Sequence, residues 1–226
     1  MERTHGPIAF GYHAAAARLA HKYNIVSVMD RATIALQTFF PASFDTWVEH
    51  ESLRAKRTLL HTEDAIEAVN LLRALSWKDM LPAALYLCSQ LRPEPLLQGH
   101  RRADRTLERL ATDDVARCMR LQKAFVRESA DIAARLYDTT RSDGCTNNRP
   151  FVFNTCKITL ASENRSKILG GGALHGDPLG CALRDQIDLL ETAGSVCGRC
   201  AAMLRRREEG MRREFWEKLP GLIGSG

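Results

Sequence analysis

Five cysteines, all of them after residue 144, are the side chains whose type and spacing best suit chemistry: Cys145, Cys156, Cys181, Cys197 and Cys200. The chain has seven cysteines in all, an odd number, and its start carries charge and histidine where a secretory signal would be continuously apolar. A disulfide framework is therefore not expected. Reduced thiols and a metal site are the two remaining interpretations.

Two of these cysteines form a Cys-x-x-Cys motif at residues 197–200. A turn between the two thiolates, with a helix beginning at the second, lets both bind one tetrahedral metal ion, but alone they make half a site. Cys145 and Cys156 can supply the other half, although their spacing is wider than that of a standard zinc finger. We predict a structural zinc site formed by Cys145, Cys156, Cys197 and Cys200, with sulfur atoms within about 4 Å of one another.

Other interpretations of the same residues stay open. Cys181 and His175 are alternative ligands, and unligated, reduced cysteines are the simplest case. A redox function for the Cys-x-x-Cys needs a strand followed by a helix, which the surrounding helical sequence does not offer. A catalytic cysteine with His175 needs a base and an orienting group that the sequence does not bring together. We therefore expect that the protein is not an enzyme.

Arginines are concentrated near the end of the chain: Arg205, Arg206, Arg207, Arg212 and Arg213. Glutamates alternate with them at spacings of three or four, which favours an ion-paired, solvated helix face. The whole chain has 32 basic and 27 acidic residues, a net charge of only +5, so a nucleic-acid partner is not expected. The alternative function is a zinc-dependent regulator that contacts nucleic acid through this helix.

Composition excludes other classes of protein. Hydrophobic residues make up 45% and charged residues 26%, which suits a folded globular body. The sequence has no run of 18 apolar residues, so no membrane span is expected and the chain is predicted to be cytoplasmic or nuclear.

Apolar residues recur every three or four positions through most of the chain, which predicts an all-α fold. Helices are expected over 12–23, from a cap at Ser27 to about 39, as a pair within 61–91, and over about 112–138. Arg92-Pro93-Glu94-Pro95 is expected to end the pair. The longest periodic stretch starts at 112, and its helix should run about 25 residues, because one apolar stripe continues through all of it.

The segment 142–178 is predicted to be irregular, with a short strand at Phe151-Val152-Phe153. Glycines 170–172 do not match a phosphate-binding loop, since no Gly-Lys-Ser/Thr follows them. Asp177-Pro178 should begin a helix that Gly194 ends, and a last helix should run from about Cys200.

The segment AAAARLAHKYNIVSVMDRATIAL resembles the C-terminal helix pair of BTB (POZ) domains. The next segment, DAIEAVNLLRALSWKDMLPAALYLCSQL, is similar to the region that follows the BTB domain in fungal BTB-containing proteins. So are the later Gly-Cys, Asp-Pro-Leu, Cys-x-x-Cys and Trp-x-x-Leu-Pro phrases. The resemblance covers most of the chain, but the strand-rich N-terminal part of a BTB domain is missing from it.

This resemblance implies a non-catalytic module that binds a protein partner, with homodimerisation expected only where a complete BTB domain is present. It also implies three segments: residues 1–41 as the C-terminal helices of a truncated BTB-like domain, 42–139 as a helical domain, and 140–226 as an irregular loop with two helices. The long helix near 112–138 is expected to serve as the spine.

Overall fold

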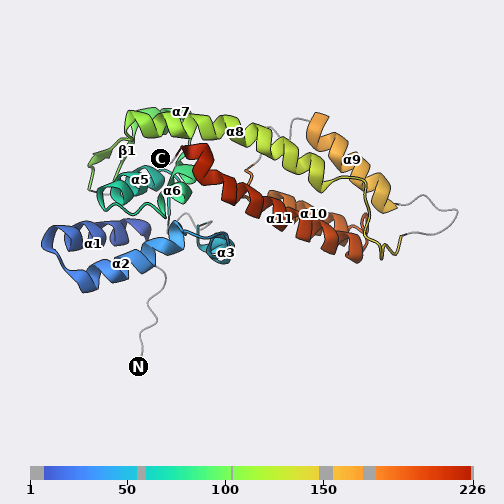
Figure 1. Ribbon diagram of the computed structural model, residues 1–226, viewed down its shortest axis with the longest axis horizontal. Coiled ribbons are helices and arrows are strands. Elements are labelled where there is room, and N and C mark those ends of the chain that lie inside the picture. The colour runs from blue at the N-terminus through green and yellow to red at the C-terminus, as the bar shows by residue number, and fades with distance from the viewer. Residues whose placement is uncertain (1–7, 55–59, 103, 148–154, 170–176, 225–226) are drawn as a thin grey trace, which may run out of the picture. The chain divides into compact units, whose positions relative to one another are not determined.

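The computed structural model describes residues 8–54, 60–102, 104–147, 155–169 and 177–224. Over these residues the chain forms eleven helices and one two-stranded sheet, which confirms the predicted all-α fold (Figure 1). The apolar spacing therefore predicted the class of secondary structure correctly.

Helices α1 (Phe10–Tyr23) and α2 (Val26–Phe39) form the predicted N-terminal hairpin (Figure 1). Asn24 adopts the left-handed conformation (φ 54°), and its N–H bonds to the last carbonyls of α1, so the helix ends there. The second helix begins at Val26, one residue before Ser27, the expected cap, because the tight turn leaves only Asn24 and Ile25 between the two helices.

Helices α5 (Asp64–Ala74) and α6 (Leu81–Cys88) are the pair predicted within residues 61–91. The short α3 (Phe44–Glu49) and α4 (Glu51–Arg54) precede them. Trp47 of α3 is buried and meets Tyr86 of α6 edge to face, with ring centroids 5.5 Å apart. Aromatic contact therefore joins α3 to this pair.

The prolines after the pair start another helix. Arg92-Pro93-Glu94-Pro95 was expected to end the pair, and α6 does end before it, at Cys88. Helix α7 (Pro93–Gln98) then begins at the same prolines, because proline in a first helical turn leaves no N–H unpaired. Strands β1 (His100–Arg101) and β2 (Leu107–Glu108) follow and pair antiparallel, with His100 opposite Glu108.

Helix α8 (Thr112–Leu136) has 25 residues and begins where the sequence predicts. Helix α9 (Thr155–Leu169) was not predicted, because residues 142–178 were expected to be irregular. Its apolar stripe is short: Cys156 and Leu160 are buried, while most of its other described side chains are polar. Packing and a 3.0 Å bond from Asn164 Nδ2 to Ala134 O hold it in place. The expected strand at 151–153 lies outside the described residues, as do glycines 170–172.

Helix α10 (Ala182–Thr192) begins later than Asp177-Pro178 suggests. Asp177 Oδ1 accepts the Leu179 N–H at 3.0 Å and so caps a separate turn, which Gly180 then closes. Gly194 follows α10 in the left-handed region (φ 69°), as predicted. Helix α11 (Gly198–Ile223) buries the predicted face. That face consists of Leu204, Met211, Phe215 and Leu219.

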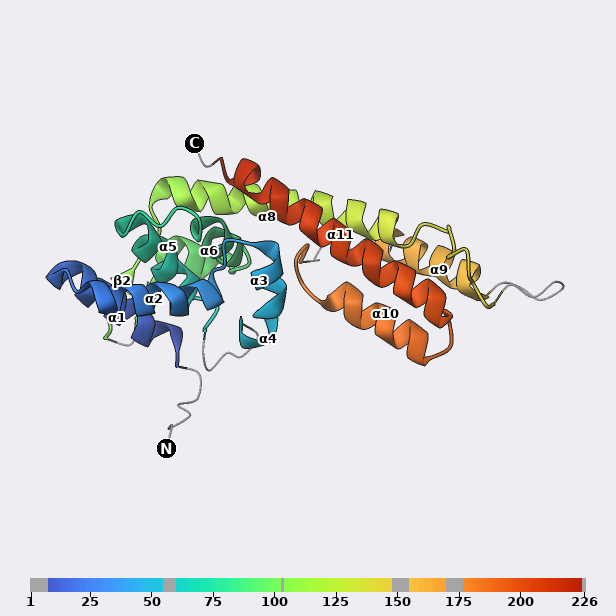
Figure 2. The same cartoon turned by 60° about the horizontal axis from the view of Figure 1, so that its bottom comes forward.

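The chain divides into two compact units: residues 1–121 with 219–226, and residues 122–218. In the second unit, α9, α10 and α11 enclose a core that includes Ile132, Leu136, Leu160, Ile187 and Leu204 (Figure 2). Among the described helices, none combines the length and apolar character needed to cross a lipid bilayer.

Candidate metal centre

The sulfur atoms of four cysteines, Cys145, Cys156, Cys197 and Cys200, lie within 4.8 Å of one another. The Sγ atoms of Cys145 and Cys197 are 3.9 Å apart. With Zn–S bonds of about 2.3 Å, a tetrahedral site has sulfur atoms about 3.8 Å apart. The outer limit of 4.8 Å is wider than the sequence-based expectation of about 4 Å. Side-chain movement of about 1 Å would shorten the longest sulfur–sulfur distance to that of a tetrahedral site.

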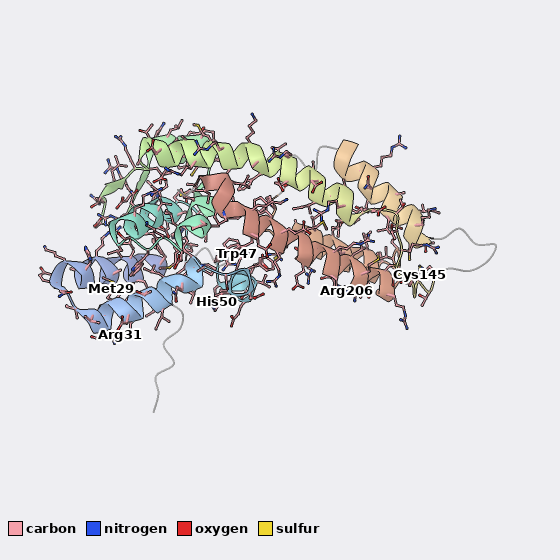
Figure 3. All side chains as sticks on the ribbon, in the orientation of Figure 1. Met29, Arg31, Trp47, His50, Cys145 and Arg206 are labelled. Carbon is pink, nitrogen blue, oxygen red and sulfur yellow. The ribbon has the colours of Figure 1, made fainter. Side chains whose placement is uncertain are left out.

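Three separate elements of the second unit supply these sulfurs. Cys145 lies in the loop after α8 and is labelled in Figure 3, Cys156 lies in the first turn of α9, and Cys200 lies in the first turn of α11. Cys197 directly precedes α11, and its carbonyl accepts the Ala201 N–H at 2.9 Å, closing the turn within the Cys-x-x-Cys. The cluster thus brings the start of α9 next to the start of α11, although forty residues separate Cys156 from Cys197 in the sequence.

Polar groups of the chain point at the sulfurs. Cys156 Sγ accepts hydrogen bonds from the Cys197 N–H and from Asn147 Nδ2, each at 3.2 Å. The Cys145 N–H bonds to Ser142 O at 2.9 Å, which holds the loop in a turn. N–H groups that donate to sulfur, as those of Cys197 and Asn147 do, stabilise thiolate over thiol.

Cys197 differs in acidity from Cys156 and Cys200. Burial opposes ionisation of Cys197, but hydrogen bonds from Cys200 and Thr146 outweigh it and lower the Cys197 pKa to about 5. Burial raises the pKa of Cys200 to about 12 and also raises that of Cys156. Without a cation, therefore, Cys197 forms a thiolate readily, whereas a bound metal ion would be needed to ionise Cys156 and Cys200.

Burial also separates the cluster into an inner and an outer half. Cys156 and Cys200 are fully buried in the apolar core, whereas Cys145 and Cys197 are partly exposed. All four candidate ligands are protein sulfurs, which leaves no position open for water or substrate on a four-coordinate ion. The arrangement suits a structural metal and does not suit a catalytic one.

Basic side chains surround the outer half. Arg141 and Lys157 line a recess of about 530 Å³ together with Cys145. Arg199 packs across Gly144, where a Cβ atom would come within 2.7 Å of Arg199 Cδ. Four thiolates with one divalent ion would carry a net charge of −2, which Arg141 and Lys157 would partly offset, although Asp143 lines the same recess.

The other candidate residues lie elsewhere. Cys181 immediately precedes α10 and is not one of the four clustered cysteines. His175 lies outside the described residues, so neither its ligand role nor its pairing with a catalytic cysteine is tested. Asn147 and Thr146 were not singled out from the sequence, because a donor to sulfur has no distinctive spacing and is found only from the tertiary contacts.

The arginine-rich part of α11 is partly ion-paired, both along the helix and to α10. Arg205 bonds to Asp188 and Glu191 of α10. Arg212 was expected on the solvated face; instead it is only 4% exposed and bonds to the fully buried Glu208. Its two Nη groups donate to Glu208 and, at 2.6 Å, to the Leu179 carbonyl, which offsets the cost of burying the charge.

No protein-family model, curated protein or solved structure matches this chain. The resemblance to BTB-containing proteins therefore stays a prediction.

Proposed function

We propose that this protein is a non-catalytic protein-interaction module whose second unit is stabilised by a structural zinc ion. Cys145, Cys156, Cys197 and Cys200 would be the ligands. The observation that carries the zinc assignment is the gathering of these four sulfurs within 4.8 Å of one another. Tetrahedral sites made only of thiolates select zinc or an iron–sulfur cluster, and a mononuclear structural site of this kind is typical of zinc.

Metal analysis of the purified chain tests this assignment. We expect one zinc per chain, lost in Cys197→Ser and kept in Cys181→Ser, the matched control outside the cluster. Replacement by cobalt(II) should give the strong visible absorption of a tetrahedral thiolate site. Substoichiometric metal in the unaltered chain, or full zinc content in Cys197→Ser, would refute the site. If the purified protein instead contains iron and absorbs visible light, the site is an iron–sulfur cluster and the zinc assignment is wrong.

The interaction role rests on the exposed surface of the hairpin and on the family resemblance. Tyr12, Leu19 and Tyr23 are each more than half exposed and lie at spacings of seven and four along α1, so they share one face of the helix. Large exposed apolar side chains gathered in this way are typical of a surface that a partner covers. Over the described residues we find no nucleophile, base and orienting group assembled as an enzyme requires.

A binding experiment separates this function from the nucleic-acid alternative. We expect the zinc-loaded chain to bind a purified partner protein directly, with little loss of affinity at high salt. The double variant Leu19→Asp/Tyr23→Asp should lose much of that affinity. Oligonucleotide binding that falls steeply with salt would instead favour the alternative.

A further inference from the structure

The second unit contains an open groove of about 850 Å³, separate from the cysteine cluster. It lies between the end of α8, α9 and the middle of α11, with the Asp138-Thr139 segment at its edge. Its size is within the range of sites that hold several ligand groups. Small residues, Ala134, Ala161 and Gly210, are among its lining, and the space beside Gly210 is empty to at least 4 Å.

The arginines of α11 differ in whether they have a carboxylate partner. Arg205, Arg212 and Arg213 each pair with an acidic side chain, and none of the three lines the groove. Arg206, labelled in Figure 3, and Arg207 both line it, and neither forms an ion pair with a described carboxylate, although Asp138, which also lines the groove, lies close enough to attract Arg207. Two arginines of this helix thus face one concave surface, and Arg206 is the more exposed of them.

Arg207 has an unused donor beneath this surface. Its Nη2 donates a long bond of 3.4 Å to Thr140 O, while Nη1 is buried without a partner among the described residues. A buried guanidinium N–H that has lost water is satisfied best by a carboxylate or another anion. Asn164 adds an acceptor, because its Nδ2 is used on Ala134 O and its Oδ1 has no donor in the described chain.

We infer that this groove binds an acidic segment of a partner protein, with a carboxylate side chain seated between Arg206 and Arg207. The small side chains of the lining leave room for the segment's backbone, and Asn164 Oδ1 is placed to accept one of its N–H groups. Nucleic acid fits less well, since Asp138 and Glu214 also line the groove and would repel a phosphate chain that is charged at every step, whereas a peptide can place its carboxylates beside the arginines alone. The inference rests on the proposed interaction function and gives it a partner chemistry.

The test uses the zinc-loaded full chain and a displayed library of random-sequence peptides. We expect enrichment of peptides rich in Asp and Glu, with affinity that falls at least about tenfold in Arg206→Glu. Arg213→Glu is the matched control: the same charge reversal on the same helix, outside the groove, should leave affinity unchanged. Glu214→Gln should tighten binding, because it removes a lining carboxylate and frees Arg135 from its ion pair.

Three results would overturn the inference. These are no enriched peptide, acidic peptides that Arg206→Glu binds as well as the unaltered chain, or binding of oligo(dT) that Arg206→Glu abolishes. The groove assignment can fail without the proposed interaction function: if a purified partner still binds Arg206→Glu at full affinity, the interaction function stands and only the groove assignment is lost.

Discussion

Glu208 is the shared carboxylate of a buried ion-pair network in the second unit. It is fully buried, accepts a bond from Arg184 Nε at 2.9 Å, and pairs with the buried Arg212 four residues later. Glu208→Ala would leave a buried guanidinium without its anion. We expect it to lower the free energy of unfolding by about 3–5 kcal/mol, measured by urea denaturation. Glu209→Ala, at an exposed ion pair, should change it by less than about 1 kcal/mol. Equal effects of the two substitutions would contradict this assignment.

Tyr137, unlike Glu208, has a buried polar group whose removal should not destabilise the protein. Its hydroxyl is buried without a hydrogen-bond partner among the described residues, and burial raises its pKa. Because Tyr137→Phe removes a polar group that has lost water and gained no partner, we expect equal stability or a gain of about 1 kcal/mol in chemical denaturation. A loss of more than about 1 kcal/mol would indicate that the hydroxyl is satisfied in solution.

Cys197 should dominate the thiol chemistry of the metal-free protein. Its pKa of about 5 means that it stays largely thiolate at pH 6, whereas burial keeps Cys156 and Cys200 protonated. After chelation, iodoacetamide at pH 6 should modify Cys197 first, as seen by peptide mass spectrometry, and its rate should fall as pH drops through about 5. Zinc should protect all four cysteines. A Cys197 that reacts equally with zinc bound would favour a thiol enzyme.

Two helices of the second unit show what local sequence can and cannot predict. Helix α8 has acidic residues in its first turn and one apolar stripe along its length, so its bounds follow from the sequence. Helix α9 buries only Cys156 and Leu160 among its described side chains, and its polar side chains suit a loop equally well. It is helical because α8 and the cluster hold it, and tertiary contact routinely outweighs weak propensity.

Two glycines, one after a helix and one inside a helix, give a prediction in which substitution by alanine has opposite effects on stability. Gly194 has φ 69° with no atom within 4 Å of an added Cβ, so Gly194→Ala should destabilise the protein by about 1 kcal/mol through backbone strain alone. Gly221 lies inside α11 with the same free space, and Gly221→Ala should stabilise it by about 0.5–1 kcal/mol. Thermal unfolding measures both. The same sign for the two variants would contradict the helix assignment at one position.

For the whole molecule, removal of metal should affect the two compact units differently. Chelation frees the loop that carries Cys145 from α9 and α11, so amide protons near residues 142–147 and 197–201 should lose protection from hydrogen exchange. Amides of α5 and α6, in the first unit, should exchange as before. Lost protection in both units would mean that metal supports the whole chain, and no loss at all would mean that the cluster is not a metal site.

The sequence by itself determined the all-α class, the N-terminal hairpin, the α5–α6 pair and the long α8, because a helix depends on contacts three and four residues apart. It also singled out the four cysteines as a set, since thiol chemistry and the Cys-x-x-Cys spacing are visible without a fold. Only the tertiary structure brought Cys145 and Cys156 to the start of α11, and only it made α9 helical. It likewise decided which arginines of α11 are paired with carboxylates and which face a groove. Those outcomes depend on residues far apart in the chain, whose meeting is decided by packing and not by local spacing.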